Sequence, residues 1–407
     1  MSDHGDKIQL GLNGFGRIGR LTFRAVMEKY SDKVQVVMIN DPFIKPKMMS
    51  YLLMHDSVHG KPNFDIGEHG EDFFTVNGHV IKVSAEENPF KIPWAASGVE
   101  FVGETSGKNQ SSLGSQGHLH SGASRIIISA PAKDALTPVF CYGVNHKEYN
   151  ASTMNIVSNA SCTTNCLAPL AKVVNDRFGI VEGFMTTVHA MTASQAVVDG
   201  TNKKPRLGRA AGRNIIPTTT GAAAALGEVL PSLSGRLTGM AFRVPVENVS
   251  VLDLTCRLEH PMNSIAELVQ AIDTAKGDMV STDADLEPSY LYLPVSACIC
   301  LYLTGSSPSS DAPSLPLLRI HYGQANVIGY TEDQAVSSDF NHDERSCIVD
   351  VSASMLLNPH FVKLVAYYDN EWAYAVRMVD LILHMKAAES GGGQGGARAE
   401  EAMQQQK

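Results

Sequence analysis

Cys162 and His189 are the two side chains in this sequence best suited to covalent chemistry. Cys162 follows small polar residues of the kind that cap helices and precedes the apolar stretch 167–174. We therefore expect it near a helix N-terminus, where the dipole lowers the pKa of a thiol and favours the nucleophilic thiolate. His189 ends the β-rich run 185–188, and a histidine there can exchange a proton with a nearby thiol. Taken singly, a buried cysteine and a structural histidine remain alternatives.

A glycine-rich segment near the N-terminus has the pattern of a dinucleotide-binding turn. Gly14, Gly16 and Gly19 form G-x-G-x-x-G between a predicted strand and a predicted helix. The first glycine permits a sharp bend, the second lets backbone approach a pyrophosphate, and the third lets helix and strand pack closely. Asp41 follows the next predicted strand. Its carboxylate would accept hydrogen bonds from ribose hydroxyls and repel a 2′-phosphate, which favours NAD over NADP. An ordinary strand-to-helix turn is the alternative.

Several hydroxyl side chains could bind anions together with the guanidinium fork of Arg243. Turn and capping roles are the alternative for each of them, and spacing along the chain does not show that they converge. The hydroxyl residues are Ser161, Thr163, Thr192, Ser194 and the run Thr218, Thr219 and Thr220, which Gly221 follows.

The elements that must position these residues indicate an α/β protein with two domains. A strand at 8–12, a helix at 21–29 and a strand at 34–39 form a β-α-β unit, which predicts a Rossmann-type doubly wound parallel sheet at 1–160. Longer strand candidates with fewer helices predict an α+β catalytic domain with a mixed or antiparallel sheet at 161–369. Further strand candidates are 75–83, 99–102 and 125–129 in the first domain and 184–189, 238–244, 249–258 and 361–368 in the second, followed by a helix at 372–386.

Composition excludes several classes of protein. The net charge of -9 argues against a primary nucleic-acid binder. The 7 cysteines lack paired spacing, which argues against a disulfide framework and for a reducing compartment. The N-terminus has no signal-peptide character, and the most apolar run, 291–303, is too short to cross a bilayer. We expect a soluble cytoplasmic protein with no metal site and no dedicated nucleic-acid or membrane partner.

Two segments differ in character from the rest. Residues 279–324 combine clustered prolines and serines with an apolar run that has no amphipathic period. A tolerated surface insertion and translated sequence foreign to the fold, such as a retained intron, are equally good interpretations. The tail 387–407 is rich in Gly, Ala, Glu and Gln, and this low complexity predicts disorder.

Five motifs together resemble the glyceraldehyde-3-phosphate dehydrogenase family. They are NGFGRIGR at 13–20, SCTTN at 161–165, MTTVH at 185–189, NIIP at 214–217 and YDNEW at 368–372. The resemblance covers about 7–277 and 327–386. It implies NAD-dependent, phosphorylating oxidation of D-glyceraldehyde 3-phosphate to 1,3-bisphosphoglycerate, a step of glycolysis and gluconeogenesis. It also implies a homotetramer, in which the S-loop at about 198–213 lies near the neighbouring subunit's cofactor, and a helix at 370–386 that returns to the first domain.

The resemblance also implies a role for each matched residue. Cys162 would attack the aldehyde to give a hemithioacetal and then a thioester, and His189 would serve as its base. Inorganic phosphate would cleave the thioester. The substrate's phosphate would contact Thr192, Ser194 and Arg243, and the attacking phosphate would contact Ser161, Thr163, Thr220 and Gly221. Cofactor contacts would come from Asn13, Gly14, Phe15, Gly16, Arg17, Ile18, Asp41, Ser129 and Asn370, the last of which would orient the nicotinamide amide.

The sequence departs from the family pattern without losing a catalytic group. Ser194 replaces a threonine, Ala196 and Ala224 stand where lysines are common, and Lys108 lies in a divergent stretch beside the cofactor. The segment 279–324 replaces a short link. Alternatives in function are the related erythrose-4-phosphate dehydrogenase, an enzyme that hydrolyses the thioester, or a catalytically impaired binding protein if the insertion disrupts the fold.

Overall fold

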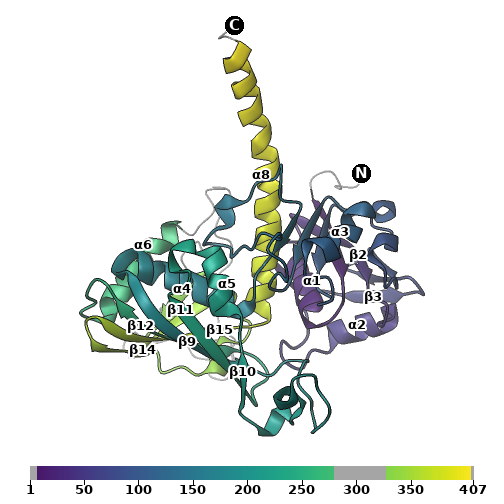
Figure 1. The fold of residues 1–407 in the computed structure, drawn as a ribbon. Coiled ribbons are helices and arrows are strands. Elements are labelled where there is room, and N and C mark those ends of the chain that lie inside the picture. The colour runs from purple at the N-terminus through teal and green to yellow at the C-terminus, as the bar shows by residue number, and fades with distance from the viewer. Residues whose placement is uncertain (1–6, 279–326, 405–407) are drawn as a thin grey trace, which may run out of the picture.

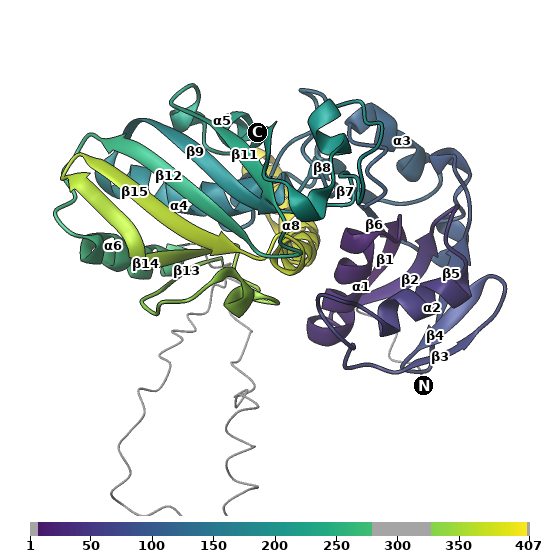
Figure 2. The ribbon, with the colours of Figure 1, turned by 90° about the horizontal axis from the view of Figure 1, so that it is seen from below.

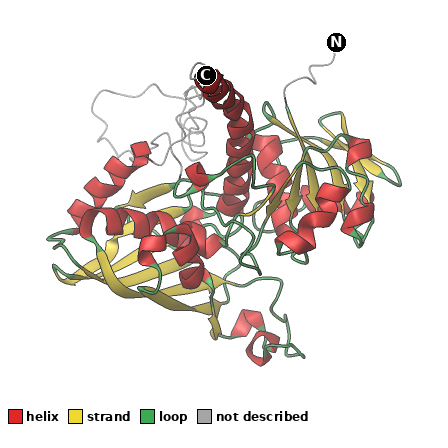
Figure 3. Cartoon of the chain, turned by 45° about the horizontal axis from the view of Figure 1, so that its top comes forward, coloured by secondary structure: helices red, strands yellow, loops and turns green. Residues whose placement is uncertain are grey.

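The computed structural model describes residues 7–278 and 327–404. Two sheets lie on either side of the long C-terminal helix α8 (Figures 1 and 3). The predicted insertion 279–324, and with it the choice between a surface insertion and foreign sequence, lies outside the described residues. None of the helices in the described part of the chain combines the length and apolar character needed to cross a bilayer.

The first sheet contains the predicted β-α-β unit. Strand β1 (Ile8–Asn13), helix α1 (Arg17–Lys29) and strand β2 (Val34–Asn40) follow one another, and β1 pairs in parallel with β2 and with β6. The strand order β3-β4-β5-β2-β1-β6-β7-β8 reverses direction of growth at β1, which is the doubly wound pattern. The fold class expected for this part is confirmed. The remaining strands are β3 (Ile66–His69), β4 (Phe73–Val76), β5 (His79–Ser84), β6 (Phe101–Glu104), β7 (Arg125–Ile128) and β8 (Ile156–Ser158).

One strand expected in this sheet is a hairpin. The run 75–83 was predicted as continuous, but β4 ends at Val76 and β5 begins at His79, and the two pair antiparallel. Asn77 and Gly78 between them have φ angles of 48° and 76°. The sequence Asn-Gly tolerates two successive positive φ angles, which is what a tight two-residue hairpin turn requires. The prediction of one continuous strand is wrong because Asn77 and Gly78 form a turn within the β-rich run.

Helices cover both faces of the first sheet. On one face, α1 and α8 pack with β1 through buried residues that include Leu10, Val26 and Val379. On the other face, Met38, Trp94 and Ile126 form a smaller core. The shorter elements of this region are α2 (Pro46–Met54), α3 (Ser112–His120) and the 3-10 turns η1 (Pro89–Lys91), η2 (Ala95–Ser97) and η3 (His146–Glu148).

The second sheet is mixed, as predicted. Its strand order is β10-β11-β9-β12-β15-β14-β13. Strand β9 pairs in parallel with β11 and antiparallel with β12. The strands are β9 (Ile180–Ala190), β10 (Ile216–Thr219), β11 (Leu237–Val244), β12 (Ser250–Leu258), β13 (Ile328–Thr331), β14 (Cys347–Asn358) and β15 (Phe361–Tyr368). Because β8 ends at Ser158 and β9 begins the second sheet, we keep 1–160 and 161–369 as the proposed domain boundaries.

One face of the second sheet carries helices and the other does not. Helices α4 (Cys162–Phe178), α5 (Ala222–Val229) and α6 (Ile265–Asp278) lie behind β9, β12 and β15 in the view of Figure 2. The buried core between them includes Leu167, Met185, Leu252 and Leu364. The 3-10 turns η4 (Pro205–Gly208), η5 (Ala211–Arg213), η6 (Pro231–Leu233) and η7 (Ser337–Phe340) lie in its connections.

Helix α8 (Trp372–Gln404) returns to the first sheet and extends beyond it (Figure 1). Its buried residues Val376, Val379 and Ile382 share a core with α1 and β1. The sequence predicts a helix to 386 and a disordered tail from 387, whereas the structure continues the helix to Gln404.

Candidate active site

Cys162 begins helix α4, as the small polar residues before it predict. Ser161 is the N-cap, and its Oγ accepts a hydrogen bond of 3.0 Å from the Thr164 backbone N–H. Asn165 stabilises the turn that leads into this helix, because its side-chain amide donates to the carbonyls of Asn159 (2.8 Å) and Ser161 (3.0 Å). Ala160 has a φ angle of 54°, so the chain bends sharply as it leaves β8. This bend places the half-buried thiol of Cys162 at the positive end of the helix.

Strand β9 brings His189 to that thiol. Side chains alternate along the strand, so Met185, Thr187 and His189 point toward the helices and are buried. The Nε2 atom of His189 lies 3.5 Å from the Sγ atom of Cys162. The nucleophile and base predicted from separate motifs are therefore in contact.

Arg243 joins this pair through the pairing of strands. Strand β11 lies parallel to β9 with Arg243 opposite His189. The Nη1 atom of Arg243 lies 2.7 Å from Nδ1 of His189 and donates to the Ala190 carbonyl at 3.0 Å. The same carbonyl lies 2.7 Å from His189 Nδ1. The Ala190 carbonyl only accepts and favours a proton on Nδ1, whereas the Arg243 guanidinium only donates and favours a lone pair there. In either tautomer Nε2 is the ring nitrogen that faces the thiol.

Burial and the Arg243 charge set the ionisation of the pair. Burial raises the pKa of the Cys162 thiol, while the Arg243 guanidinium and hydrogen bonds from Thr163 act to lower it. Burial and the Arg243 charge lower the pKa of His189 to about 4. The expected lowering of the thiol pKa by the helix dipole is therefore wrong as a net result, because desolvation outweighs it. Both shifts favour the neutral thiol and the neutral imidazole in the resting site, so His189 accepts the thiol proton as the sulfur attacks.

Tyr368 packs against His189 and contacts Thr163, the neighbour of Cys162. It lies in the YDNEW motif, but no role of its own was predicted for it from the sequence. Its ring is buried and meets His189 edge to face, with ring centroids 6.1 Å apart. Its hydroxyl lies 2.9 Å from Thr163 Oγ1 and 2.8 Å from Thr187 Oγ1. The sequence signals were its place in the YDNEW motif and at the end of a strand, two residues before Asn370. These contacts restrict the His189 ring and turn the Thr163 hydroxyl toward the core.

The other predicted hydroxyls lie at loop and helix ends. Thr192 and Ser194 are exposed to partly exposed, with their oxygens 2.9 Å apart. Thr220 Oγ1 accepts from the Ala222 backbone N–H at 3.2 Å, and Gly221 is the N-cap of helix α5. Free backbone N–H groups at a helix start and nearby hydroxyls suit an anion. The geometry is compatible with phosphate binding at each position.

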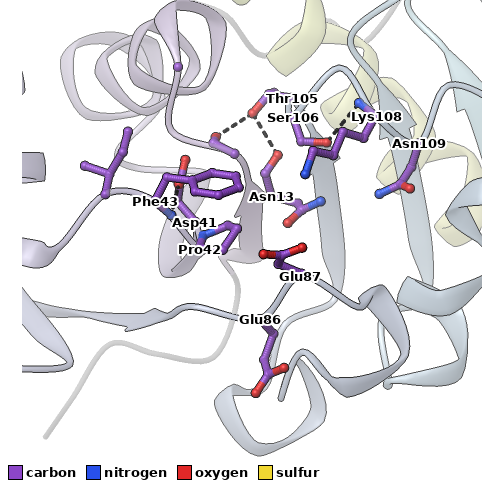
Figure 4. A pocket seen from close by; sticks show the side chains of 13 residues that line it. Asn13, Asp41, Pro42, Phe43, Glu86, Glu87, Thr105, Ser106, Lys108 and Asn109 are labelled. Carbon is purple, nitrogen blue, oxygen red and sulfur yellow. Dashed lines mark hydrogen bonds between the residues drawn. The ribbon is translucent and has the colours of Figure 1, made fainter.

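A cavity of about 250 Å³ opens beside the glycine-rich turn (Figure 4). Gly14 has a φ angle of 96°, and a Cβ there would meet the Ser106 backbone at 2.7 Å. A Cβ at Gly19 would lie 2.2 Å from the Gly14 carbonyl, whereas one at Gly16 would meet nothing within 4 Å. The first and third glycines are thus required for packing, and the second faces open space that suits a close pyrophosphate. The cavity is lined by Asn13, Gly14, Gly16, Asp41, Pro42, Phe43, Ile44, Glu86, Glu87, Thr105, Ser106, Lys108 and Asn109.

Two carboxylates organise this cavity. Asp41 accepts hydrogen bonds from the backbone N–H groups of Phe15 (2.8 Å) and Phe43 (2.9 Å), so it braces the turn as well as facing the cavity. Buried Glu104 accepts from Asn13 Nδ2 at 2.6 Å and from Asn109 Nδ2 at 3.0 Å. Burial acts to raise the pKa of Glu104, but hydrogen bonds, led by that of His118, lower it overall. Glu104 was not predicted as a site residue, because it lies in no recognisable motif of the sequence.

Some predicted cofactor residues lie away from this cavity. The Arg17 guanidinium donates to Asp56 at 2.6 Å and also to Glu371, so it joins segments of the protein. Phe15, Ile18 and Ser129 are not among the residues that line the cavity. Asn370 is buried, and its Oδ1 accepts from Ser250 Oγ at 2.9 Å. That bond fixes the orientation of its side-chain amide.

Comparison with known proteins decides the family. A model of the glyceraldehyde 3-phosphate dehydrogenase NAD binding domain matches residues 8–112, and a model of the C-terminal domain matches 161–290 and 307–370. The chain belongs to the glyceraldehyde-3-phosphate dehydrogenase family. It is accordingly an NAD-dependent oxidoreductase with the glycolytic function of that family. The unmatched residues 291–306 fall within the segment 279–324 that the sequence singled out as atypical.

Individual members of the family match nearly the whole chain. The testis-specific glyceraldehyde-3-phosphate dehydrogenase of Rattus norvegicus is 47% identical over 386 residues, which cover 94% of this chain and 77% of that protein. Glyceraldehyde-3-phosphate dehydrogenase 2 of Caenorhabditis elegans is 46% identical over 384 residues, covering 93% and 98%. The Podospora anserina glyceraldehyde-3-phosphate dehydrogenase is 44% identical over 379 residues, covering 93% and 97%. The expected resemblance is confirmed.

Proposed function

We propose that Cys162 is the nucleophile of the dehydrogenase reaction and that His189 is its general base. The observation that carries this assignment is the 3.5 Å contact between Sγ and Nε2. His189 takes the thiol proton, and the sulfur adds to the aldehyde carbon. The same nitrogen then protonates the new alkoxide, which gives a hemithioacetal.

The second half of the reaction reverses these proton movements. His189 removes the hemithioacetal hydroxyl proton while the carbon loses a hydride, and NAD is the acceptor of that hydride. A thioester to Cys162 results. Inorganic phosphate adds to its carbonyl carbon, the carbon–sulfur bond breaks, and the acyl phosphate leaves the sulfur as thiolate. Arg243, which contacts His189 and the Ala190 carbonyl, supplies positive charge for the substrate's own phosphate.

We assign the remaining site residues to binding. Thr192 and Ser194 accompany Arg243 at the substrate's phosphate. The site of the attacking phosphate is formed by Ser161, Thr163, Thr220 and Gly221. To contact this phosphate, the Thr163 hydroxyl must turn away from Tyr368. The cavity-lining residues Asn13, Gly14, Gly16 and Asp41 hold NAD, together with the backbone of Phe15, Arg17 and Ile18, with Ser129, and with Asn370 at the nicotinamide.

We further propose that the protein is a cytoplasmic homotetramer assembled through the helix-free face of the second sheet. Phe184 is 69% exposed on β9, and Met240 on the neighbouring β11 is 38% exposed. Exposed apolar residues on a sheet face are typical of an interface between subunits. The S-loop contributes Val198, which is 73% exposed. All five cysteines among the described residues are free, which supports a reducing compartment.

Initial-rate measurement of NADH formation tests the chemical assignment. With glyceraldehyde 3-phosphate and NAD, we expect steady turnover only when inorganic phosphate is present, and none in Cys162→Ser. Cys256→Ala, which alters a buried cysteine on β12, serves as the matched control and should retain turnover. Steady turnover without phosphate would indicate thioester hydrolysis, and a higher kcat/KM for erythrose 4-phosphate would indicate the related sugar-phosphate enzyme. Turnover by Cys162→Ser would refute the nucleophile assignment.

A further inference from the structure

A loop after η7 reaches across from the second sheet to the first domain and to the start of α8. Asn341 Nδ2 donates to the Val58 carbonyl at 2.9 Å. The His342 backbone N–H donates to Asp369 Oδ2 at 2.8 Å, and its ring stacks on Trp372 with centroids 3.8 Å apart and an interplanar angle of 18°. His342 has a φ angle of 66°, so the backbone adopts a left-handed bend to make these contacts.

His342 meets a second histidine, His59, and both rings face carboxylates. Their Nδ1 atoms are 3.1 Å apart. The Nε2 atom of His59 lies 3.1 Å from Glu371 Oε2, and the Nε2 atom of His342 lies 3.6 Å from Glu28 Oε2. The result is a continuous chain of polar contacts from Glu28 on α1 to Glu371, the residue that follows Asn370.

The chemistry of the partners assigns the protons. Burial acts to raise the pKa of Glu371, but hydrogen bonds from His59 and Arg17 lower it overall, so this carboxylate is an acceptor. His59 Nε2 must therefore donate to Glu371. A neutral His59 has only that proton, so its Nδ1 accepts, and His342 Nδ1 donates. Glu28 Oε2 faces the other His342 nitrogen at 3.6 Å.

Glu371 in turn fixes the segment that carries Asn370. Its carboxylate is held between His59 and the Arg17 guanidinium, which donates from Nε at 3.0 Å. On the other side of Asn370, Asp369 accepts from the His342 backbone and from the Trp372 backbone N–H at 2.8 Å. Both neighbours of Asn370 are thus held by groups that His342 contacts.

We propose that His342 is a positioning residue for the cofactor: by donating to His59 Nδ1 it orients the His59 ring whose Nε2 holds Glu371, and so fixes Asn370 for the nicotinamide end of NAD. This inference rests on the proposed role of Asn370. Without the His342 donor, the His59 ring loses the contact that orients it toward Glu371. The hydrogen bond from His59 to Glu371 is then weakened, and the Asn370 segment gains freedom.

Two substitutions at His342 separate this hydrogen bond from simple packing. His342→Gly suits the left-handed backbone but removes the donor. His342→Asn also tolerates that backbone, and its amide can replace Nδ1 as the donor to His59. We measure NAD affinity by calorimetry without substrate, and KM for NAD and kcat separately. His342→Gly should weaken NAD binding by about 3- to 10-fold, the effect of one lost hydrogen bond, with a smaller change in kcat. His342→Asn should restore most of the affinity.

Two further variants distinguish failure of this inference from failure of the assignment beneath it. In His59→Gln, whose amide can still donate to Glu371, adding His342→Gly should produce no additional loss of affinity. Asn370→Ala should weaken NAD binding by itself. If Asn370→Ala binds NAD normally, the assigned role of Asn370 is wrong. If Asn370→Ala is weakened but His342→Gly binds like wild type, or if His342→Asn is as weak as His342→Gly, the positioning role of His342 is overturned.

Discussion

Replacing His189 with asparagine tests whether His189 accepts the proton of the Cys162 thiol. In the structure, His189 Nε2 is the only ring nitrogen that faces the Cys162 sulfur, at 3.5 Å. Asparagine removes the base but keeps a polar group in the pocket. The Arg243 guanidinium remains opposite on β11. The change therefore isolates the imidazole as proton acceptor.

The size of the effect follows from the ionisation of the thiol. Burial raises the pKa of Cys162 above its ordinary value of 9.0. Without a base to take the proton, less than about one thiol in a hundred is ionised at pH 7. The rate of alkylation should then rise about tenfold for each pH unit between about 7 and 9, because only direct ionisation supplies thiolate. Loss of the base should lower kcat/KM by about 10²- to 10⁴-fold.

Alkylation of the free enzyme with iodoacetamide measures the thiolate directly, without substrate or cofactor. Mass spectrometry of the labelled peptide confirms that Cys162 carries the label. We expect wild type to react faster at pH 7 and to depend less on pH than His189→Asn. His260→Asn, which alters an exposed histidine, is the matched control and should behave like wild type. An identical pH profile in wild type and His189→Asn would show that His189 does not receive the proton.

Three other perturbations probe the cofactor site, the assembly and the fold. Asp41→Asn should lower the preference for NAD over NADP by about tenfold or more, because the charge that repels a 2′-phosphate is lost, and the ratio of kcat/KM values measures this. Phe184→Asp should dissociate the oligomer in sedimentation velocity, while Leu136→Asp, at an 81% exposed residue of the first domain, should not. Asp56→Asn should cost about 2 kcal/mol of unfolding free energy at pH 7, because the pKa of Asp56 is lowered from 3.8 to about 2 in the folded protein. That contribution is present above pH 4 and is lost as pH falls toward 2. In urea titrations the unfolding free energies of wild type and variant should therefore converge near pH 2. A difference in unfolding free energy that stays constant with pH would contradict this prediction.

Local patterns were enough to predict the elements that carry the chemistry. The glycine-rich turn requires Gly14 at a positive φ angle and Gly19 against a carbonyl, and both needs are readable from spacing alone. Ser161 and the small residues around it predicted the start of α4. Strand β9 was predicted because its alternation of buried and exposed residues reflects a sheet with one covered face. These features depend on neighbours within a few residues.

Net ionisation and the identity of supporting residues could not be predicted in this way. Burial raises the pKa of Cys162, and this burial depends on packing against distant strands, which the residues near Cys162 do not reveal. Glu104 has no motif around it, and the motif that contains Tyr368 does not indicate its role. The fold brings Glu104 to Asn13 and Tyr368 to His189. The contact between His59 and His342 joins positions 283 residues apart.

The sequence by itself determined the family, the order of the elements and the types of reactive group, because motif spacing and side-chain period are encoded locally. Only the tertiary structure decided which groups meet and in what ionisation state. The register of β9 and β11 places Arg243 opposite His189, and the bend after β8 sets Cys162 against it. Distances and desolvation arise when remote segments pack together, and they set pKa values and tautomers.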